Sequence, residues 1–348
     1  MKRTLYLLVL LITALACNNT STEANKEIDQ IKKTSDSSLV KAKPLKNNPE
    51  DSLNIIIQAE PNNIVALLMR ARINFNQGDR RQAIFDVQRL QDIDSLNPKM
   101  LLLLGEIQMQ KNQSREAKNS WERCAAADPM AIECRLKLGQ MYASLNEHKK
   151  ALRFLDEVIE IDEYIPSAYF FKGIVIRNYK QDTSLALNYF QKAIELKQDY
   201  FEALDMMGVS LASMGDTLAP YYYQRILDID SNRADIYYKM GVYYKSKDDL
   251  NKAIEAYTKS TQIDAKYSDS YYNLGVIFVD LKEFQDARNY FAQAIKARPR
   301  NNYKAYYGKA YCFEMLGDII NAKKDYRKSL EQLPLYKPAM EGLARVNQ

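Results

Sequence analysis

Apolar residues recur along this chain with the spacing of amphipathic helices, and the helical pattern itself returns every 33 to 35 residues. Its clearest marker is an alanine followed four residues later by a large apolar residue. The alanines are Ala83, Ala117, Ala151, Ala186, Ala219, Ala253, Ala287 and Ala322. The large residues are Val87, Trp121, Leu155, Phe190, Tyr223, Tyr257, Phe291 and Tyr326. Upstream, a glycine recurs at Gly105, Gly139, Gly173, Gly208, Gly241 and Gly275, replaced by Ala71 and Ala310 in the outer two copies.

This period predicts eight helix pairs over residues 64–336, beginning near residues 64, 98, 132, 166, 201, 234, 268 and 303. The small residues stand where two helices of a pair approach closely, and the large residues stand where a helix meets its neighbour. One pair cannot bury its own apolar face, so the copies are expected to stack into an all-α array. A further helix is expected at each end, within residues 48–63 and 337–348, to cover the terminal repeats.

The stretch Tyr271–Pro299 resembles the tetratricopeptide repeat, a helix–turn–helix unit of about 34 residues. The residues that carry the resemblance are Tyr271, Leu274, Gly275, Phe278, Ala287, Phe291, Ala294 and Pro299. The resemblance implies a right-handed superhelical solenoid of antiparallel helix pairs, with a concave groove lined mainly by the first helix of each pair. Lys309 departs from the family pattern, because an apolar residue is expected there, and it predicts a partly exposed helix in the eighth repeat.

In the family, the second, fifth, ninth, twelfth and thirteenth positions of the first helix face the groove. By this mapping the partner-binding residues are Phe170, Val209, Tyr238, Val242, Tyr272, Val276, Tyr307 and Tyr311. The same positions in the first three repeats include Arg72, Phe75, Glu106, Met109 and Gln140. Tyrosine offers rigid contact area with a polar tip, which suits a peptide or protein ligand. The alternative is that the tyrosines only pack against neighbouring helices.

The N-terminus has the pattern of an export signal over residues 1–16, with Lys2 and Arg3 preceding an apolar run that is too short for a permanent membrane span. The stretch Ala14–Cys17 resembles a bacterial lipobox, which implies that Cys17 becomes the lipidated (diacyl and palmitate) first residue. Ala14 departs from the leucine usual at that position, and Ala14–Ala16 also suits cleavage by the ordinary signal peptidase. Residues 17–47 are polar and predict a flexible tether. No aspartate follows Cys17, so by analogy with lipoprotein sorting we expect a periplasm-facing protein of the outer membrane in a Gram-negative-type envelope.

Three further cysteines are relevant to the predicted export, because disulfides form in oxidising compartments such as the periplasm. Cys124 and Cys134 lie on successive predicted helices either side of a turn, where they form either a disulfide or two small buried residues. Cys312 has no candidate partner. No spacing of cysteine and histidine indicates a metal site.

Charge and motifs give no support for catalysis or for nucleic-acid binding. The formal net charge of +5 is weak and scattered, so no nucleic-acid partner is expected. The single histidine, His148, lies in a predicted turn, where a surface role is expected, and no phosphate-binding or nucleophile motif occurs. We therefore expect no cofactor and no enzymatic activity.

Together these features predict a non-catalytic scaffold that binds a peptide segment or a helix of a partner protein, in envelope assembly, secretion or wall remodelling. Two alternatives remain at this stage. One is a structural module that assembles with itself, for instance as a homodimer through an uncovered end. The other is a glycan-binding receptor on the outer surface.

Overall fold

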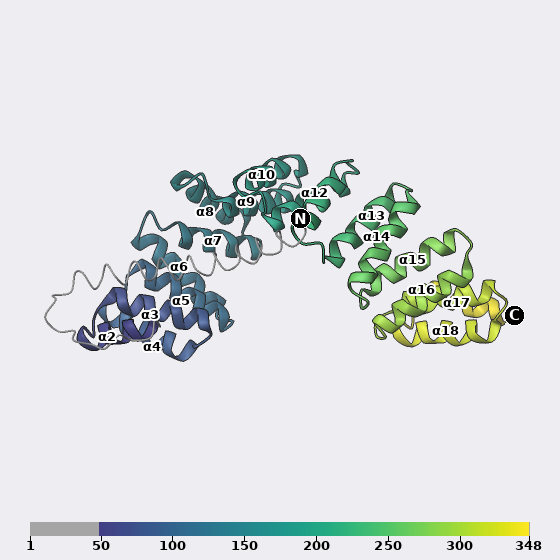
Figure 1. Ribbon diagram of the computed structural model, residues 1–348, viewed down its shortest axis with the longest axis horizontal. Helices are drawn as coiled ribbons and strands as arrows, with labels where there is room; N and C mark the ends of the chain where they lie inside the picture. The colour runs from purple at the N-terminus through teal and green to yellow at the C-terminus, as the bar shows by residue number, and fades with distance from the viewer. Residues whose placement is uncertain (1–48, 348) are drawn as a thin grey trace, which may run out of the picture. The chain divides into compact units, whose positions relative to one another are not determined.

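The computed structural model describes residues 49–347, in which every regular element is a helix (Figure 1). This confirms the all-α fold predicted from the repeat. The predicted signal peptide (1–16), the tether (17–47) and Cys17 lie outside the described residues. None of the helices of the described part is both long and apolar enough to cross a bilayer.

The chain divides into two compact units, with the boundary between Glu163 and Tyr164. The first unit contains α2 (Pro49–Ala59), α3 (Ile64–Gln77), α4 (Arg80–Ile93), α5 (Pro98–Gln110), α6 (Ser114–Ala127), α7 (Ile132–Ser144) and α8 (His148–Ile161). The second contains α9 (Pro166–Tyr179), α10 (Thr183–Leu196), α11 (Phe201–Ser213), α12 (Ala219–Ile229), α13 (Ala234–Ser246), α14 (Leu250–Ile263), α15 (Ser268–Asp280), α16 (Phe284–Ala297), α17 (Tyr303–Met315), α18 (Ile319–Gln332) and α19 (Lys337–Asn347). From α3 to α18 the helices pack in consecutive pairs, one pair for each sequence repeat.

A single residue in the left-handed backbone conformation closes the turn within each pair. Its φ is positive at Gly78, Asn112, Asn146, Gln181, Gly215, Asp248, Lys282 and Gly317. In four repeats an aspartate before the second helix accepts a hydrogen bond from a backbone amide of the first turn: Asp79, Asp182, Asp249 and Asp318. The turns therefore end one helix and begin the next without leaving these amide groups unpaired.

The packing inside each pair follows from the glycine and the large apolar residue of the repeat. A Cβ atom on Gly275 would lie 2.7 Å from the ring of Phe291, and one on Gly105 would lie 2.2 Å from the indole of Trp121. All eight repeat alanines of the second helix are fully buried. The small residues therefore provide the space in which the large side chain of the same repeat is buried.

The helices at the two ends cover the terminal repeats. Helix α2 buries Leu53 and Ile57 against the core of the first unit, which includes Leu67. Helix α19 buries Ala339 and Val346, and its Gly342 approaches the ring of Tyr326 so closely that a Cβ atom would lie 2.4 Å from it.

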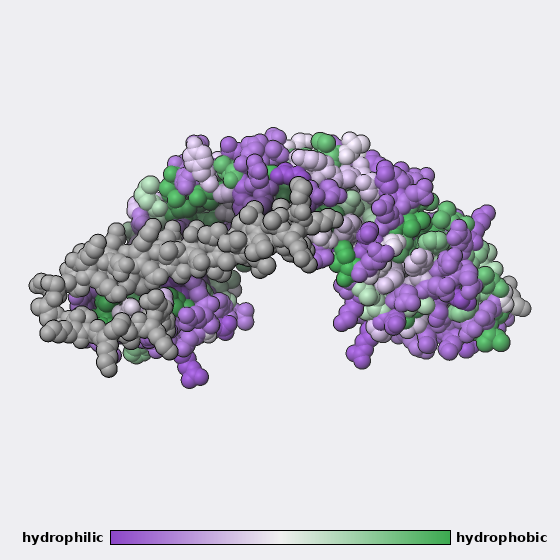
Figure 2. All heavy atoms as spheres, viewed as in Figure 1, coloured by the Kyte–Doolittle hydropathy of each residue, from purple (hydrophilic) through white to green (hydrophobic). Residues whose placement is uncertain are grey.

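The outer side of α19 carries the exposed charged residues Lys337 and Glu341 beside Met340, which is 48% exposed. On the face drawn in Figure 2, hydrophilic and hydrophobic residues are interspersed over the second unit. Homodimerisation through this end stays a prediction.

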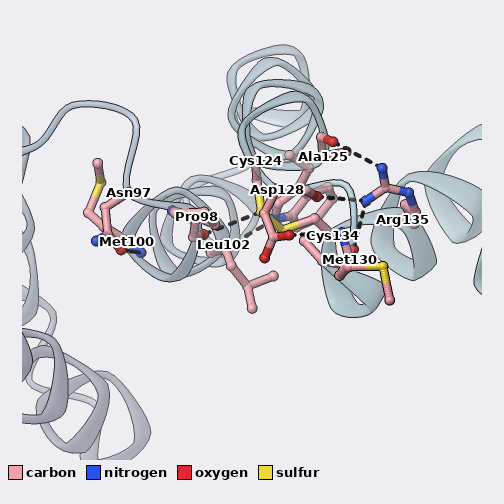
Figure 3. Close-up of a disulfide and its surroundings, with 12 residues drawn as sticks. Asn97, Pro98, Met100, Leu102, Cys124, Ala125, Asp128, Met130, Cys134 and Arg135 are labelled. Carbon is pink, nitrogen blue, oxygen red and sulfur yellow. Dashed lines mark hydrogen bonds between the residues drawn. A yellow bond between two sulfur atoms is a disulfide. The ribbon is translucent and has the colours of Figure 1, made fainter. Parts of the chain in front are cut away.

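A disulfide joins the second repeat to the third. Cys124 on α6 and Cys134 on α7 are bonded, with their Cα atoms 6.1 Å apart, and both are buried (Figure 3). Beside the bond, Arg135 donates hydrogen bonds of 3.0 Å to the backbone carbonyls of Ala125, in the last turn of α6, and of Asp128, which follows that helix. Of the two alternatives left by the sequence, the disulfide is the one observed. Cys312 is free and buried.

Candidate functional site

Aromatic rings at the fifth position of four first helices in the second unit pack against their own repeats. Each lies against the large aromatic residue of the second helix of the same pair. The ring-centroid distances are 6.0 Å for Phe170–Phe190, 5.9 Å for Tyr238–Tyr257, 5.7 Å for Tyr272–Phe291 and 6.0 Å for Tyr307–Tyr326. These four residues, which we call the fifth-position aromatics, therefore belong to the helix packing.

Three of the fifth-position aromatics also contact a tyrosine that precedes the next first helix. The centroid distances are 5.3 Å for Phe170–Tyr200, 5.3 Å for Tyr238–Tyr267 and 5.6 Å for Tyr307–Tyr336. These second contacts lie between repeats. Phe170 and Tyr238 thus join their repeats to the next repeat, and Tyr307 joins the last repeat to the residue before α19.

The exposure of the fifth-position aromatics differs between phenylalanine and tyrosine. Phe170 is only 8% exposed, so little of it remains for a ligand. Tyr238, Tyr272 and Tyr307 are half-buried, and burial raises the pKa of each hydroxyl. Part of each tyrosine ring therefore packs against its own repeat and the rest stays accessible, whereas partner binding by these rings stays a prediction.

The remaining predicted groove residues of the second unit also differ in exposure. Val242 on α13 is 44% exposed. Val209 on α11 is half-buried, and Val276 on α15 packs against the core around Phe291. Tyr311 on α17 is half-buried, with its ring 6.2 Å from that of Phe284. Val242 is therefore the predicted groove residue with the most free surface.

A pocket of about 460 Å³ lies in the first unit, on the first helices of the first three repeats. Its lining residues are Phe75 on α3, Glu106, Met109 and Gln110 on α5, Trp121 on α6, and Lys137, Gln140, Met141 and Ser144 on α7. Four of them, Phe75, Glu106, Met109 and Gln140, occupy ninth or twelfth positions of their first helices. We call this cavity the three-helix pocket.

Glu106 and Lys137 are the charged residues that line the three-helix pocket, and Arg72 on α3 contacts Glu106 beside it. Glu106 accepts a hydrogen bond from Arg72 on one side, and Lys137 Nζ lies 3.6 Å from its other oxygen. Arg72 also lies over the Phe75 ring, 5.9 Å from its centroid. The carboxylate is 19% exposed, whereas the side chains of Arg72 and Lys137 are 38% and 37% exposed. The two cations are thus more accessible than the anion between them.

Within residues 49–347, no group of three histidine, cysteine or acidic side chains is placed to hold a metal ion. His148, the only histidine, is half-buried at the start of α8.

Two family models describe this architecture from the sequence alone. Both are tetratricopeptide repeat models; one matches residues 225–300 and the other matches residues 102–166 and 272–337. Together they span about half of the chain, and the matched ranges include helix pairs of both units. The chain belongs to the tetratricopeptide repeat family. As a tetratricopeptide repeat protein it is a scaffold for protein–protein interaction.

Similar proteins agree with this tetratricopeptide fold. The chain is 22% identical over 298 residues to the "Protein CTR9 homolog" of Arabidopsis thaliana, and it spans 26% of the length of that curated relative and 81% of its own. The solved structure of Pseudomonas aeruginosa pilF matches 62% of this chain and 94% of its own, with a TM-score of 0.52 and 15% identity. A tetratricopeptide repeat protein from Parabacteroides merdae matches 72% of this chain and 99% of its own, with a TM-score of 0.50 and 12% identity. Such distant structural likeness shows the fold alone.

The three-helix pocket of this tetratricopeptide repeat protein was not singled out from the sequence. The family pattern places inward positions on α3, α5 and α7, but it does not indicate a cavity beside them. The missed signal is the charge pattern at the ninth position. Arg72 and Glu106 occupy that position one repeat apart, with opposite charges on neighbouring first helices.

Proposed function

We propose that this protein is a non-catalytic, lipid-anchored adaptor of the bacterial envelope that holds a segment of a partner protein on its first-helix face. The observation that carries the proposal is the three-helix pocket, because its wall comes from three consecutive first helices. The pocket combines apolar side chains with a small number of polar groups, as ligand-binding pockets generally do. A segment lying across several first helices would contact one repeat after another.

The half-buried tyrosines and Val242 of the second unit support the same proposal. A tyrosine ring that is fixed by packing loses little conformational entropy when a ligand covers its free side. Tyr238, Tyr272 and Tyr307 are fixed in this way. Exposed Val242 adds an apolar contact one helical turn from Tyr238.

The disulfide supports export to an oxidising compartment. Disulfides persist in the periplasm and outside cells, whereas cytosolic thiols are kept reduced. The bonded pair Cys124–Cys134 lies far along the chain from the predicted signal and lipobox, so it supports export separately from them. We propose that the protein faces the periplasm from the outer membrane, anchored through lipid on Cys17.

Site-specific photocrosslinking in intact cells tests partner binding. A photoreactive phenylalanine analogue would replace Val242 in the second unit or Gln140 in the three-helix pocket, and Glu255, exposed on the second helix α14, as the control. We expect the same partner band from Val242 or Gln140, absent from Glu255, and its identification by mass spectrometry. Equal labelling from all three sites, or none from Val242 and Gln140, would contradict binding on the first-helix face.

Fractionation tests the anchor. Cys17→Ser should release the protein from membranes into the soluble periplasmic fraction, while the matched variant Cys312→Ser should leave it membrane-bound. Metabolic labelling with an alkyne-bearing fatty acid should mark the wild type and not Cys17→Ser. Membrane association and labelling that survive Cys17→Ser would exclude lipidation at this residue.

A further inference from the structure

The three-helix pocket has a charge imbalance that selects the chemistry of its ligand. Glu106 is the one anion between two cations, Arg72 and Lys137, so the cluster carries a net positive charge. The other charged residues of α3, α5 and α7 are Arg70, Lys99, Glu133 and Arg135. Arg70 pairs with buried Asp86 at 2.6 Å, and Arg135 pairs with Glu157 on α8 at 3.1 Å. Lys99 and Glu133, near the starts of their helices, have opposite charges and offset one another.

Arg72 and Lys137 also have N–H donors on their exposed sides that Glu106 does not use. An arginine has five N–H donors and a lysine has three, and Glu106 uses only part of them. An incoming carboxylate would accept from both cations and reduce the excess charge. An incoming ammonium or guanidinium group would meet two like charges and would have to compete for the less exposed Glu106.

The walls beside the charges are apolar. Phe75, Met109, Trp121 and Met141 line the pocket, and Met109 is 39% exposed. Met109 adapts to ligands of different shape and the half-buried ring of Phe75 offers contact area, whereas Trp121 and Met141, only 4% and 8% exposed, contribute little accessible surface. A large apolar side chain therefore fits beside the carboxylate.

We propose that the three-helix pocket binds a partner segment in which an aspartate or glutamate side chain stands next to a large apolar side chain. This specificity rests on the proposed function, because it names the kind of segment that the adaptor would hold. The carboxylate would lie against Arg72 and Lys137, and the apolar side chain would lie against Met109 and Phe75. The chain terminus of the partner is not needed.

Selection from a random library of displayed dodecapeptides tests the specificity with the full chain. Fusing the peptides through their C-termini to the phage coat protein offers no free terminal carboxylate. We expect enrichment of peptides in which an acidic residue adjoins phenylalanine, leucine or methionine. The most enriched peptide would then be synthesised with its acidic residue intact, as the amide, and as lysine. The amide form should bind roughly tenfold more weakly, which corresponds to one charge-assisted hydrogen bond.

Charge reversal in the protein provides the matched control. Lys137→Glu should remove the preference for the acidic peptide, whereas Lys149→Glu, the same change at an exposed site on α8 outside the pocket, should keep it. Circular dichroism would establish that both variants remain helical. Lys137 is 37% exposed and makes no buried ion pair, so both variants should fold.

The remaining outcomes separate this proposal from the proposed function. Enriched peptides without an acidic preference, or an acidic preference that Lys137→Glu leaves intact, would overturn the specificity while partner binding stands. No enrichment would also overturn it, and crosslinking from Val242 would still decide whether the adaptor binds a partner elsewhere. Dimerisation of the wild type that Lys137→Glu abolishes would assign the pocket to a second copy and likewise overturn the proposal.

Discussion

Lys309 and Asp325 form an ion pair of 3.0 Å inside the last repeat, where the Asp325 side chain is only 5% exposed. The first repeat has the same arrangement: Arg70 pairs with Asp86, whose side chain is fully buried. In both repeats the cation is the seventh residue of the first helix, and the aspartate lies three residues after the repeat alanine. Lys309 therefore has a buried partner, which explains a lysine at a position where the second, third and seventh repeats carry leucine.

Removing the cation of this pair should destabilise the last repeat. Lys309→Leu would leave the Asp325 carboxylate buried and unpaired, which costs roughly 3 kcal/mol. We expect faster hydrogen exchange in α17 and α18 and a lower midpoint for the C-terminal unfolding step. Hydrogen exchange followed by mass spectrometry measures the first, and it is suited to repeat arrays because their unfolding is not always two-state.

A double replacement provides the control. Lys309→Leu/Asp325→Tyr copies the Leu274 and Tyr290 pair found at the same positions of the preceding repeat. The double variant should recover most of the protection from hydrogen exchange that Lys309→Leu loses, because replacing both members of a buried pair avoids the unpaired charge. If Lys309→Leu alone exchanges like the wild type, the pair does not contribute to stability.

The close approach of Gly275 to Phe291 predicts that this glycine cannot be replaced without cost. Gly275→Ala places a methyl group 2.7 Å from a rigid, buried ring. Overpacking of this kind costs typically 1–3 kcal/mol, and the better helix propensity of alanine returns about 1 kcal/mol of it. Thermal unfolding monitored by circular dichroism should show a lower midpoint for this variant.

The first repeat suggests a second substitution that would compensate for the stability lost in Gly275→Ala. There Ala71 stands in the glycine position and the smaller Val87 stands in the large-residue position. Gly275→Ala/Phe291→Val should therefore lose less stability than the sum of the two single variants. Additive losses would mean that the two residues do not compete for the same space.

Much of the fold could be predicted because both helices of each repeat carry a marker of their packing. The first helix has a glycine or alanine, and the second has an alanine followed by a large apolar residue. The helices start at the predicted repeat starts, and all eight repeat alanines are fully buried. The role of Tyr238 could not be predicted in the same way. Its second contact, with Tyr267, depends on a residue of the turn before the next repeat, which the family pattern does not specify.

The candidate site was harder to predict for a similar reason. A pocket forms where the side chains of three neighbouring helices do not fill the space between them. The sequence gives the side chains but not the size of that space. Glu106 and Gln140 could be placed on the inward face by their positions, yet their neighbours decide whether a cavity lies beside them. The charge cluster likewise depends on Lys137, which lies one position beyond the fifth position of its helix.

The Cys124–Cys134 disulfide should stabilise the first unit. It closes a loop between residues ten positions apart, for which the chain-entropy model gives roughly 3 kcal/mol. Cys124→Ser/Cys134→Ser should lower the thermal midpoint of the N-terminal unfolding step and speed hydrogen exchange in α6 and α7. Cys312→Ser, which removes an unbonded cysteine, should leave α6 and α7 unchanged. Unchanged protection in the double variant would contradict a stabilising disulfide.

Glu314 links the last repeat to α19 in a way that should depend on pH. Arg345 on α19 donates hydrogen bonds of 2.8 and 3.0 Å to its two oxygens, and Tyr326 donates a further one. Burial alone would raise the pKa of Glu314, but the hydrogen bonds from Arg345 and Tyr326 outweigh it, so the pKa is lowered. Because the folded-state pKa lies below the unfolded value of about 4.3, the contribution to stability is complete above that value. It is lost as the pH falls through the lower, folded-state pKa.

Comparison of the wild type with Glu314→Gln across pH isolates this contribution. At pH 7 the variant should be less stable by about 1 kcal/mol, a modest figure because Arg345 is half-exposed. The difference should hold down to about pH 5 and shrink below about pH 4, because the carboxylate of the unfolded wild type takes up a proton there and that of the folded protein does so at lower pH. Glu341→Gln, at a 57% exposed glutamate on α19, should show no comparable difference at any pH. A stability gap for Glu314→Gln that persists unchanged at pH 3 would mean that the side chain acts through shape rather than charge.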